Sequence, residues 1–222
     1  KGKERDSDYD FDNRQGEFSR SYAKLKDSTA QRASLGIGWH FLPHRIISLR
    51  PQVGYAWSET DFHAKKGYQA VSGPSVNYPS LGVPPVGSTL DGLDSRYKPT
   101  TYGPWVGFQV GLHPARWLDL KADVKYQWAK YTADANWNLR SDLQHPKSFR
   151  HSGDIQGWQV GGEAAWNITS HHAIIAGVEW SKKSLSGGKD KTYFANGNVS
   201  EIKLRRVNQE SLSANLGYRF SF

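Results

Sequence analysis

The chain has 222 residues, no cysteine, no methionine and a formal net charge of +8 at pH 7. The missing cysteines exclude disulfides, thiolate metal sites and cysteine nucleophiles, and no run of about 20 apolar residues is present that would form a transmembrane helix. Only 37% of the residues are hydrophobic. The chain is therefore either rich in loops or turns its apolar residues toward something other than a core.

The predicted elements are strands in which apolar and polar residues alternate with a period of two. In the first of them, Leu35, Ile37 and Trp39 alternate with Gly36 and Gly38 on the other face. The same alternation recurs along the chain, and in order the predicted strands cover 33–41, 47–57, 102–112, 118–128, 158–168, 174–180 and 211–222.

The last stretch gives the clearest pattern. From Ser211 to Phe222 the apolar face carries only Leu, Ala, Tyr and Phe, and the stretch ends on Phe222. This terminus resembles the closing strand of bacterial outer-membrane barrels, whose final aromatic residue is the assembly signal of that class.

The connections between the predicted strands alternate in length. Those at 42–45, 113–116 and 169–172 are short, whereas those at 59–101, 130–156 and 185–208 are long. Short periplasmic turns and long extracellular loops are expected of a transmembrane barrel, while a soluble sandwich has little reason to keep every long loop at one end. We therefore predict an all-β fold, a transmembrane antiparallel β-barrel in the bacterial outer membrane. It forms one domain over 1–222 with extracellular segments at about 1–31, 59–101, 130–156 and 185–208.

Seven strands are visible, but single-chain bacterial barrels have even strand counts. One or three further strands are therefore expected upstream of Lys1, and ten in the complete protein is the favoured total. The inner faces carry charges of both signs, which should pair and fill the lumen and so argue against a wide diffusion pore. The basic residues predicted to point inward near carboxylates are Arg32, Arg50, Lys121, Lys125 and Arg219.

The positive charges are scattered, and no run of five or six basic residues occurs. This distribution indicates a dispersed solvated surface and no nucleic acid partner. The expected partners are outer-membrane lipids and anionic lipopolysaccharide, with an extracellular protein or another surface ligand at the loops.

Several blocks of the sequence resemble the omptins, the ten-stranded outer-membrane proteases. The blocks follow in the family's order: ERDSDYD (4–10), VGYAWSETDF (53–62), YKPTTYGPWVG (97–107), YQWAKYTADANWN (126–138) and the closing strand. The resemblance covers most of the chain and implies a ten-stranded barrel.

The resemblance also implies where a catalytic site would lie. Omptin catalysis is attributed to a water held between an acidic pair and an Asp-x-His pair. Asp6 and Asp8 match the acidic pair, but Asn136 and Asn138 stand where the Asp and the His are expected. Without that imidazole the site has no evident base with a pKa near neutrality, so an active protease is not expected. The nearby histidines are His145 and His151.

Other interpretations of these residues stay open. Asp6, Asp8, Asp10 and Asp12 form an acidic ladder, which fits a hydrated loop, a water-activating pair or a calcium site. Four further histidines lie in or beside the short turns and are interpreted as turn-surface residues, because they lack ligand spacing: His44, His113, His171 and His172. We predict no cofactor and no metal.

The leading functional hypothesis is a non-proteolytic surface-binding, adhesive or structural role carried by the long extracellular loops. The alternative is an omptin-like endopeptidase that uses Asp6 and Asp8. A third hypothesis, a narrow channel or conduit component, depends on the fold alone.

Overall fold

The computed structural model describes residues 2–11, 14–40, 42–43, 46–77, 79 and 82–220. Four residues discussed above, Lys1, Asp12, His44 and Phe222, lie outside this described part. The described residues form strands joined by turns: β1 (Gly2–Phe11), β2 (Gln15–Leu25), β3 (Thr29–Gly38), β4 (Leu42–Pro43), β5 (Ile47–Ser72), β6 (Thr89–Ala115), β7 (Leu118–Asn136), β8 (Phe149–Asn167), β9 (His172–Tyr193) and β10 (Val199–Phe220).

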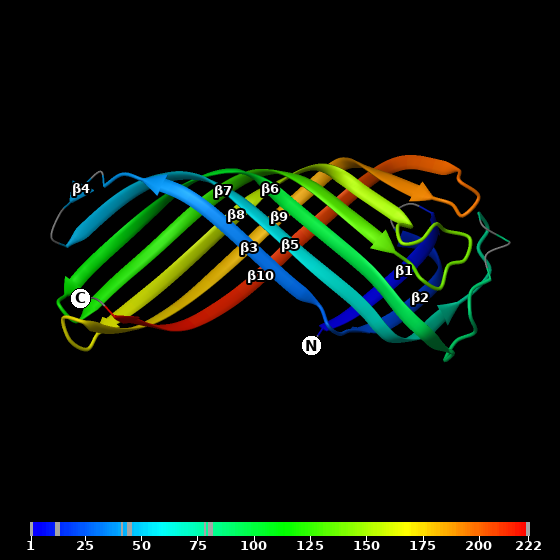
Figure 1. The fold of residues 1–222 in the computed structure, drawn as a ribbon, viewed down its shortest axis with the longest axis horizontal. Coiled ribbons are helices and arrows are strands. Elements are labelled where there is room, and N and C mark those ends of the chain that lie inside the picture. The colour runs from blue at the N-terminus through cyan, green and yellow to red at the C-terminus, as the bar shows by residue number, and fades with distance from the viewer. Residues whose placement is uncertain are drawn as a thin grey trace.

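The strands pair antiparallel in one sheet, in the order β1-β2-β5-β6-β7-β8-β9-β10. β3 and β4 also pair with β5, so β2 and β3 follow one another along the same edge of β5. The sheet is not closed, because within the described residues β3 and β10 each pair with one strand only. Figure 1 shows the tilted strands, with the short turns and the C-terminus at one end and the β1–β2 hairpin toward the other.

Each of the seven predicted strands is present, as β3 and β5 to β10. The predicted pairing of the last strand is also confirmed, since β10 pairs with β9 and places Leu216 opposite Ala176 and Tyr218 opposite Ile174. Leu216 and Tyr218 point outward and are 81% and 62% exposed, as expected of side chains that contact lipid. The predicted register of the apolar face is therefore correct.

The strands are much longer than predicted, which corrects the loop boundaries. Most of the three segments predicted as long loops is strand, and the N-terminal segment holds the β1–β2 hairpin. The connections left between strands on this side are 73–88, 137–148 and 194–198.

The reason for this difference lies on the outer face of the sheet. We call the outward-facing apolar zone that includes Leu216 and Tyr218 the apolar band. Beyond it, β5 turns Glu59, Asp61 and His63 outward, so the alternation of apolar with polar residues is lost there. The backbone nevertheless stays paired with β6 as far as Tyr68. Sequence alternation detects a strand that faces lipid, but it does not detect the part of the same strand that faces water on its outer side.

Aromatic side chains mark the border between the apolar band and the charged zone of the outer face. These exposed residues form what we call the aromatic belt: Tyr55, Tyr102, Trp128, Trp158 and Trp180. Belts of this kind stand at the membrane–water interface of transmembrane barrels. No helix in the described part of the chain is long and apolar enough to cross a membrane.

At the level of the apolar band, where the outer face is apolar, the inner face of the sheet is polar. Beyond that level the inner face is apolar. Tyr131, Ile155 and Leu185 are almost completely buried and form the core of the strand extensions. Four of the five basic residues predicted to face carboxylates do so, at these distances: Arg32–Glu179 3.5 Å, Lys121–Glu163 3.0 Å, Lys125–Asp123 3.6 Å and Arg219–Asp119 3.3 Å. The fifth, Arg50, contacts the ring of His40 and has no carboxylate contact among the described residues.

Candidate functional site

Carboxylates of β1 gather on one face of the β1–β2 hairpin. β1 pairs with β2 so that Asp6 lies opposite Ser21 and Asp8 opposite Ser19. Because side chains alternate along a strand, Glu4, Asp6 and Asp8 share a face. We call these three residues the carboxylate cluster, and it contains both residues of the predicted acidic pair.

The cluster is partly buried, so its carboxyl groups ionise less readily than they do in water. Burial raises the pKa of Asp6 to about 7, with smaller contributions from the charges of Asp8 and Glu4. Burial also raises the pKa of Asp8, against a hydrogen bond from Ser19, and that of Glu4. Asp6 is therefore about half protonated at neutral pH, whereas an exposed aspartate would be fully ionised.

The cation that acts on this cluster is Arg140, from the connection between β7 and β8. Its guanidinium donates two hydrogen bonds to the carboxylate of Asp142, both 2.7 Å long. Its charge also acts on Asp6 and Asp8 and lowers the pKa of both, although burial outweighs it. Sequence reasoning missed Arg140, because an arginine in a connection has no period or spacing that would place it near β1.

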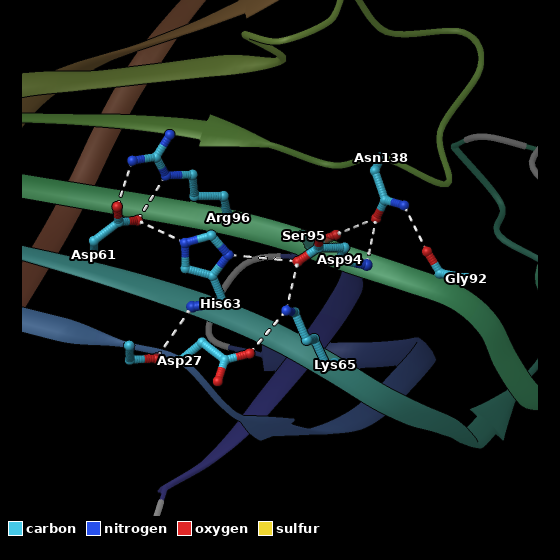
Figure 2. A network of polar contacts seen from close by, with 10 residues as sticks. Asp27, Asp61, His63, Lys65, Gly92, Asp94, Ser95, Arg96 and Asn138 are labelled. Atoms are coloured by element: carbon cyan, nitrogen blue, oxygen red, sulfur yellow. Dashed lines mark hydrogen bonds and ion pairs between the residues drawn. The ribbon is translucent and has the colours of Figure 1, made fainter.

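Asn138, predicted to occupy the histidine position, is turned toward the start of β6. Its side-chain amide donates to the carbonyl oxygen of Gly92 at 2.7 Å. Its amide oxygen accepts from the backbone nitrogen of Asp94 at 2.9 Å and from the hydroxyl of Ser95 at 3.3 Å. Asn138 therefore fastens the β7–β8 connection, which carries Arg140, to β6 (Figure 2).

An ionic network on the outer face surrounds this attachment. Figure 2 shows Arg96 paired with Asp61, and His63 placed between Asp61 and Asp94. The His63 ring nitrogens lie 3.4 Å from each of these two carboxylates. Lys65 lies 3.8 Å from Asp94 and also reaches the connection between β2 and β3. The network thus links β5, β6 and the β2–β3 connection. It lies beside Asn138, the residue that attaches the β7–β8 connection to β6.

The two histidines considered as replacements for the missing imidazole lie elsewhere. His145 contacts Asn136, with 2.7 Å between Nδ1 and Oδ1. His151 lies on the inner face of β8, where Nδ1 is 3.0 Å from the hydroxyl of Tyr97 and Nε2 is 3.5 Å from Asp190. Within the described part of the chain, neither ring contacts the carboxylate cluster.

Within the acidic ladder, Asp10 makes different contacts from Asp6 and Asp8. The carboxylate of Asp10 accepts hydrogen bonds from the backbone nitrogens of Val76 and Asn77, at 2.9 and 3.2 Å, and from Ser75. These contacts fasten the end of β1 to the connection between β5 and β6. No group of three or more histidine, aspartate or glutamate side chains among the described residues is arranged to hold a metal ion.

The site therefore combines three partly buried carboxyl groups with one guanidinium that is already paired. Such an arrangement attracts a basic group, because the negative charge exceeds the positive charge. Asp6 also takes up or releases a proton near neutral pH. Among the described histidines, none contacts this arrangement as a partner base.

Comparisons with known proteins agree with this fold. A family model described as Pom, Protochlamydia outer membrane protein, matches residues 1–222. Among solved structures, the outer membrane protease OmpT from Escherichia coli is similar, with a TM-score of 0.73 and 17% sequence identity over 98% of this chain and 73% of that chain. No curated protein sequence matches. The likeness to OmpT shows the barrel fold and leaves the activity of this chain open.

Proposed function

The chain belongs to the Protochlamydia outer membrane protein family, and we propose that it acts as a non-proteolytic binding protein at the cell surface. It is an outer-membrane protein with an omptin-like β-barrel fold. In this proposal the carboxylate cluster binds a basic group of an extracellular protein or another surface ligand. Outer-membrane lipids and lipopolysaccharide are the proposed partners of the outer face.

The observation that carries this proposal is the unbalanced charge at the cluster. Asp6 and Asp8 share the influence of one guanidinium, and Arg140 is itself held by Asp142. Glu4 adds a third carboxyl group to the same face. Burial, with a smaller contribution from the neighbouring carboxylates, raises the pKa of Asp6 to about 7. A lysine or arginine side chain of a ligand would replace the Asp6 proton, so binding a basic group and ionising Asp6 favour one another.

The endopeptidase alternative draws on the same residue. A pKa near 7 suits a general base, and Asp6 meets that requirement. Catalysis also needs a partner group that orients the base. In an Asp-x-His pair, the aspartate orients the histidine in this way. Asn138 is bonded to β6 instead, which favours binding without cleavage.

Binding is tested with the purified chain in detergent micelles and a fluorescent peptide that contains consecutive arginines. Fluorescence polarisation should show affinity that increases from pH 6 to pH 8, as Asp6 loses its proton. The double variant Asp6→Asn, Asp8→Asn should lose this binding. Asp27→Asn, which removes an exposed carboxylate from the outer ionic network, is the matched control and should bind like the original chain.

Mass spectrometry of the same peptide separates binding from proteolysis. If the chain binds the peptide without cleaving it, the peptide should be recovered intact. Cleavage between the arginines that is abolished by Asp8→Ala would establish the endopeptidase alternative. Equal binding by the double variant and the control would show that the cluster is not the binding site.

A narrow conduit is the second candidate, because the inner face lines a cavity of about 760 Å³ whose walls include Arg32, Lys125 and Glu179. A layer of buried side chains, among them Tyr131 and Leu185, borders that cavity toward the strand extensions. A water path would have to cross this layer, and we therefore rank conduction below binding. Liposomes that contain the protein should not swell faster in small sugars, whereas swelling that changes with Lys125→Glu would favour the conduit.

A further inference from the structure

A hollow of about 520 Å³ lies on the outer face of the sheet, across β5 to β9. Its wall includes three aromatic-belt residues, Tyr55, Tyr102 and Trp128. Its other side carries the polar residues Lys130, Asp154 and Gln156. Strand pairing sets these residues in rows: Tyr102 lies opposite Lys130, and Lys130 lies opposite Asp154. The hollow is separate from the carboxylate cluster and from the inner cavity.

The position of the hollow matches the interface of a membrane. The residues toward the short turns on the same outward face are apolar, for example Val106 and Val124, which are 44% and 37% exposed. In the opposite direction along β7, the outward residues are Thr132 and Asp134. A molecule seated in the hollow would therefore have its apolar part beside the band and its polar part beside the charged zone.

The floor of the hollow is formed by short residues, Gly103, Pro104 and Ala129. A Cβ atom at Gly103 would lie 2.0 Å from the carbonyl oxygen of Trp128, so β6 and β7 approach closely only because residue 103 is glycine. Gly103 and Pro104 have no long side chain that could fill the space, and Ala129 packs its side chain into the buried inner core.

Aromatic rings continue the hollow toward the apolar band. Tyr126 contacts Trp128 and Trp158 edge to face, with ring centroids 4.8 and 4.7 Å apart. These rings present a broad apolar surface directly beside the polar rim. Surfaces of this type accommodate the glycerol region and upper acyl chain of a lipid.

The charges at the rim define the headgroup. Lys130 Nζ lies 2.6 Å from Asp154 Oδ1, and the two side chains are 64% and 78% exposed. An ion pair this exposed contributes little to stability, so each partner is free to pair with a ligand at small cost. The rim therefore offers one cation and one anion side by side, with no net charge.

We propose that this hollow binds a phospholipid with a zwitterionic phosphoethanolamine headgroup. Its phosphate pairs with Lys130, and its ammonium group pairs with Asp154 and donates to the side-chain oxygen of Gln156. The acyl chains lie along the aromatic rings toward the apolar band. A purely anionic headgroup fits less well, because Asp154 would repel it.

Native mass spectrometry of the whole chain in detergent tests this proposal. Phosphatidylethanolamine and phosphatidylglycerol with the same acyl chains are added in equal amounts, and the lipid retained on the protein is counted. The chain should retain more phosphatidylethanolamine. Asp154→Asn should shift the ratio toward phosphatidylglycerol, and Lys130→Gln should lower the retention of both, each by roughly two- to fivefold.

Lys189→Gln is the matched control, because Lys189 is an exposed lysine that pairs with Glu201 outside the hollow. It should leave the lipid ratio unchanged. If the original chain retains more phosphatidylglycerol than phosphatidylethanolamine, that result alone would overturn the proposal. An unchanged ratio in Asp154→Asn, or unchanged retention of both lipids in Lys130→Gln, would overturn it as well, provided that the variants migrate as folded barrels in unheated gels.

Discussion

Replacing Asp6 by asparagine should stabilise the protein at high pH and leave its stability unchanged at low pH. Burial raises the pKa of Asp6 from 3.8 to about 7, so the folded state disfavours the ionised form. This penalty is absent below pH 3.8, grows as the pH rises, and is complete above pH 7. The difference of about three pH units corresponds to about 4 kcal/mol. The cluster is partly hydrated, which reduces the expected gain to about 2 kcal/mol at pH 8.

Equilibrium unfolding in urea, followed in detergent micelles at pH 4 and pH 8, measures this difference. Asp142→Asn provides a control of opposite sign, because Arg140 lowers the pKa of Asp142 and the loss of that ion pair should destabilise the protein at pH 8. An Asp6→Asn effect of equal size at the two pH values would refute the reasoning. So would a loss of stability at pH 8, which would mean that ionised Asp6 is stabilised by a partner.

Two further outcomes follow from the contacts. Gly103→Ala should destabilise the barrel by about 1 to 3 kcal/mol, because the new Cβ meets the carbonyl oxygen of Trp128, whereas Gly162→Ala has open space and should be neutral; heat-dependent gel mobility compares them. The double variant Asn136→Asp, Asn138→His should gain no cleavage of an arginine peptide, because residue 138 is directed toward β6; measurable turnover would show that the connection moves.

The strands in the apolar band could be predicted from the sequence because lipid on one side and a polar interior on the other impose strict alternation. Leu212, Leu216 and Phe220 follow that rule and point outward. Beyond the aromatic belt the outer face of a strand meets water, while the inner face packs into an apolar core. The pattern that identifies β10 is absent from β1, and the β1–β2 hairpin was therefore predicted as a loop.

The candidate site was predictable only in part. Asp6 and Asp8 were found because two acidic residues at i and i+2 stand in a block that resembles a known acidic pair. Their altered acidity was not predictable, since it comes from burial in the folded hairpin. The approach of Arg140 was not predictable either, because it depends on how the 137–148 connection is fastened to β6.

The same barrel end supports different chemistry according to the group that faces the carboxylates. A neutral imidazole has a lone pair and accepts a proton from water, so it acts as a base beside an acidic pair. A guanidinium has only donors and stays charged, so it orients and partly neutralises carboxylates but takes no proton. Arg140 acts on Asp6 and Asp8 through its charge alone, so Asp6 is the group of the cluster whose pKa lies near neutrality. In the proposed function, burial makes Asp6 a weak acid, and the negative charge that it shares with Glu4 and Asp8 attracts the basic ligand.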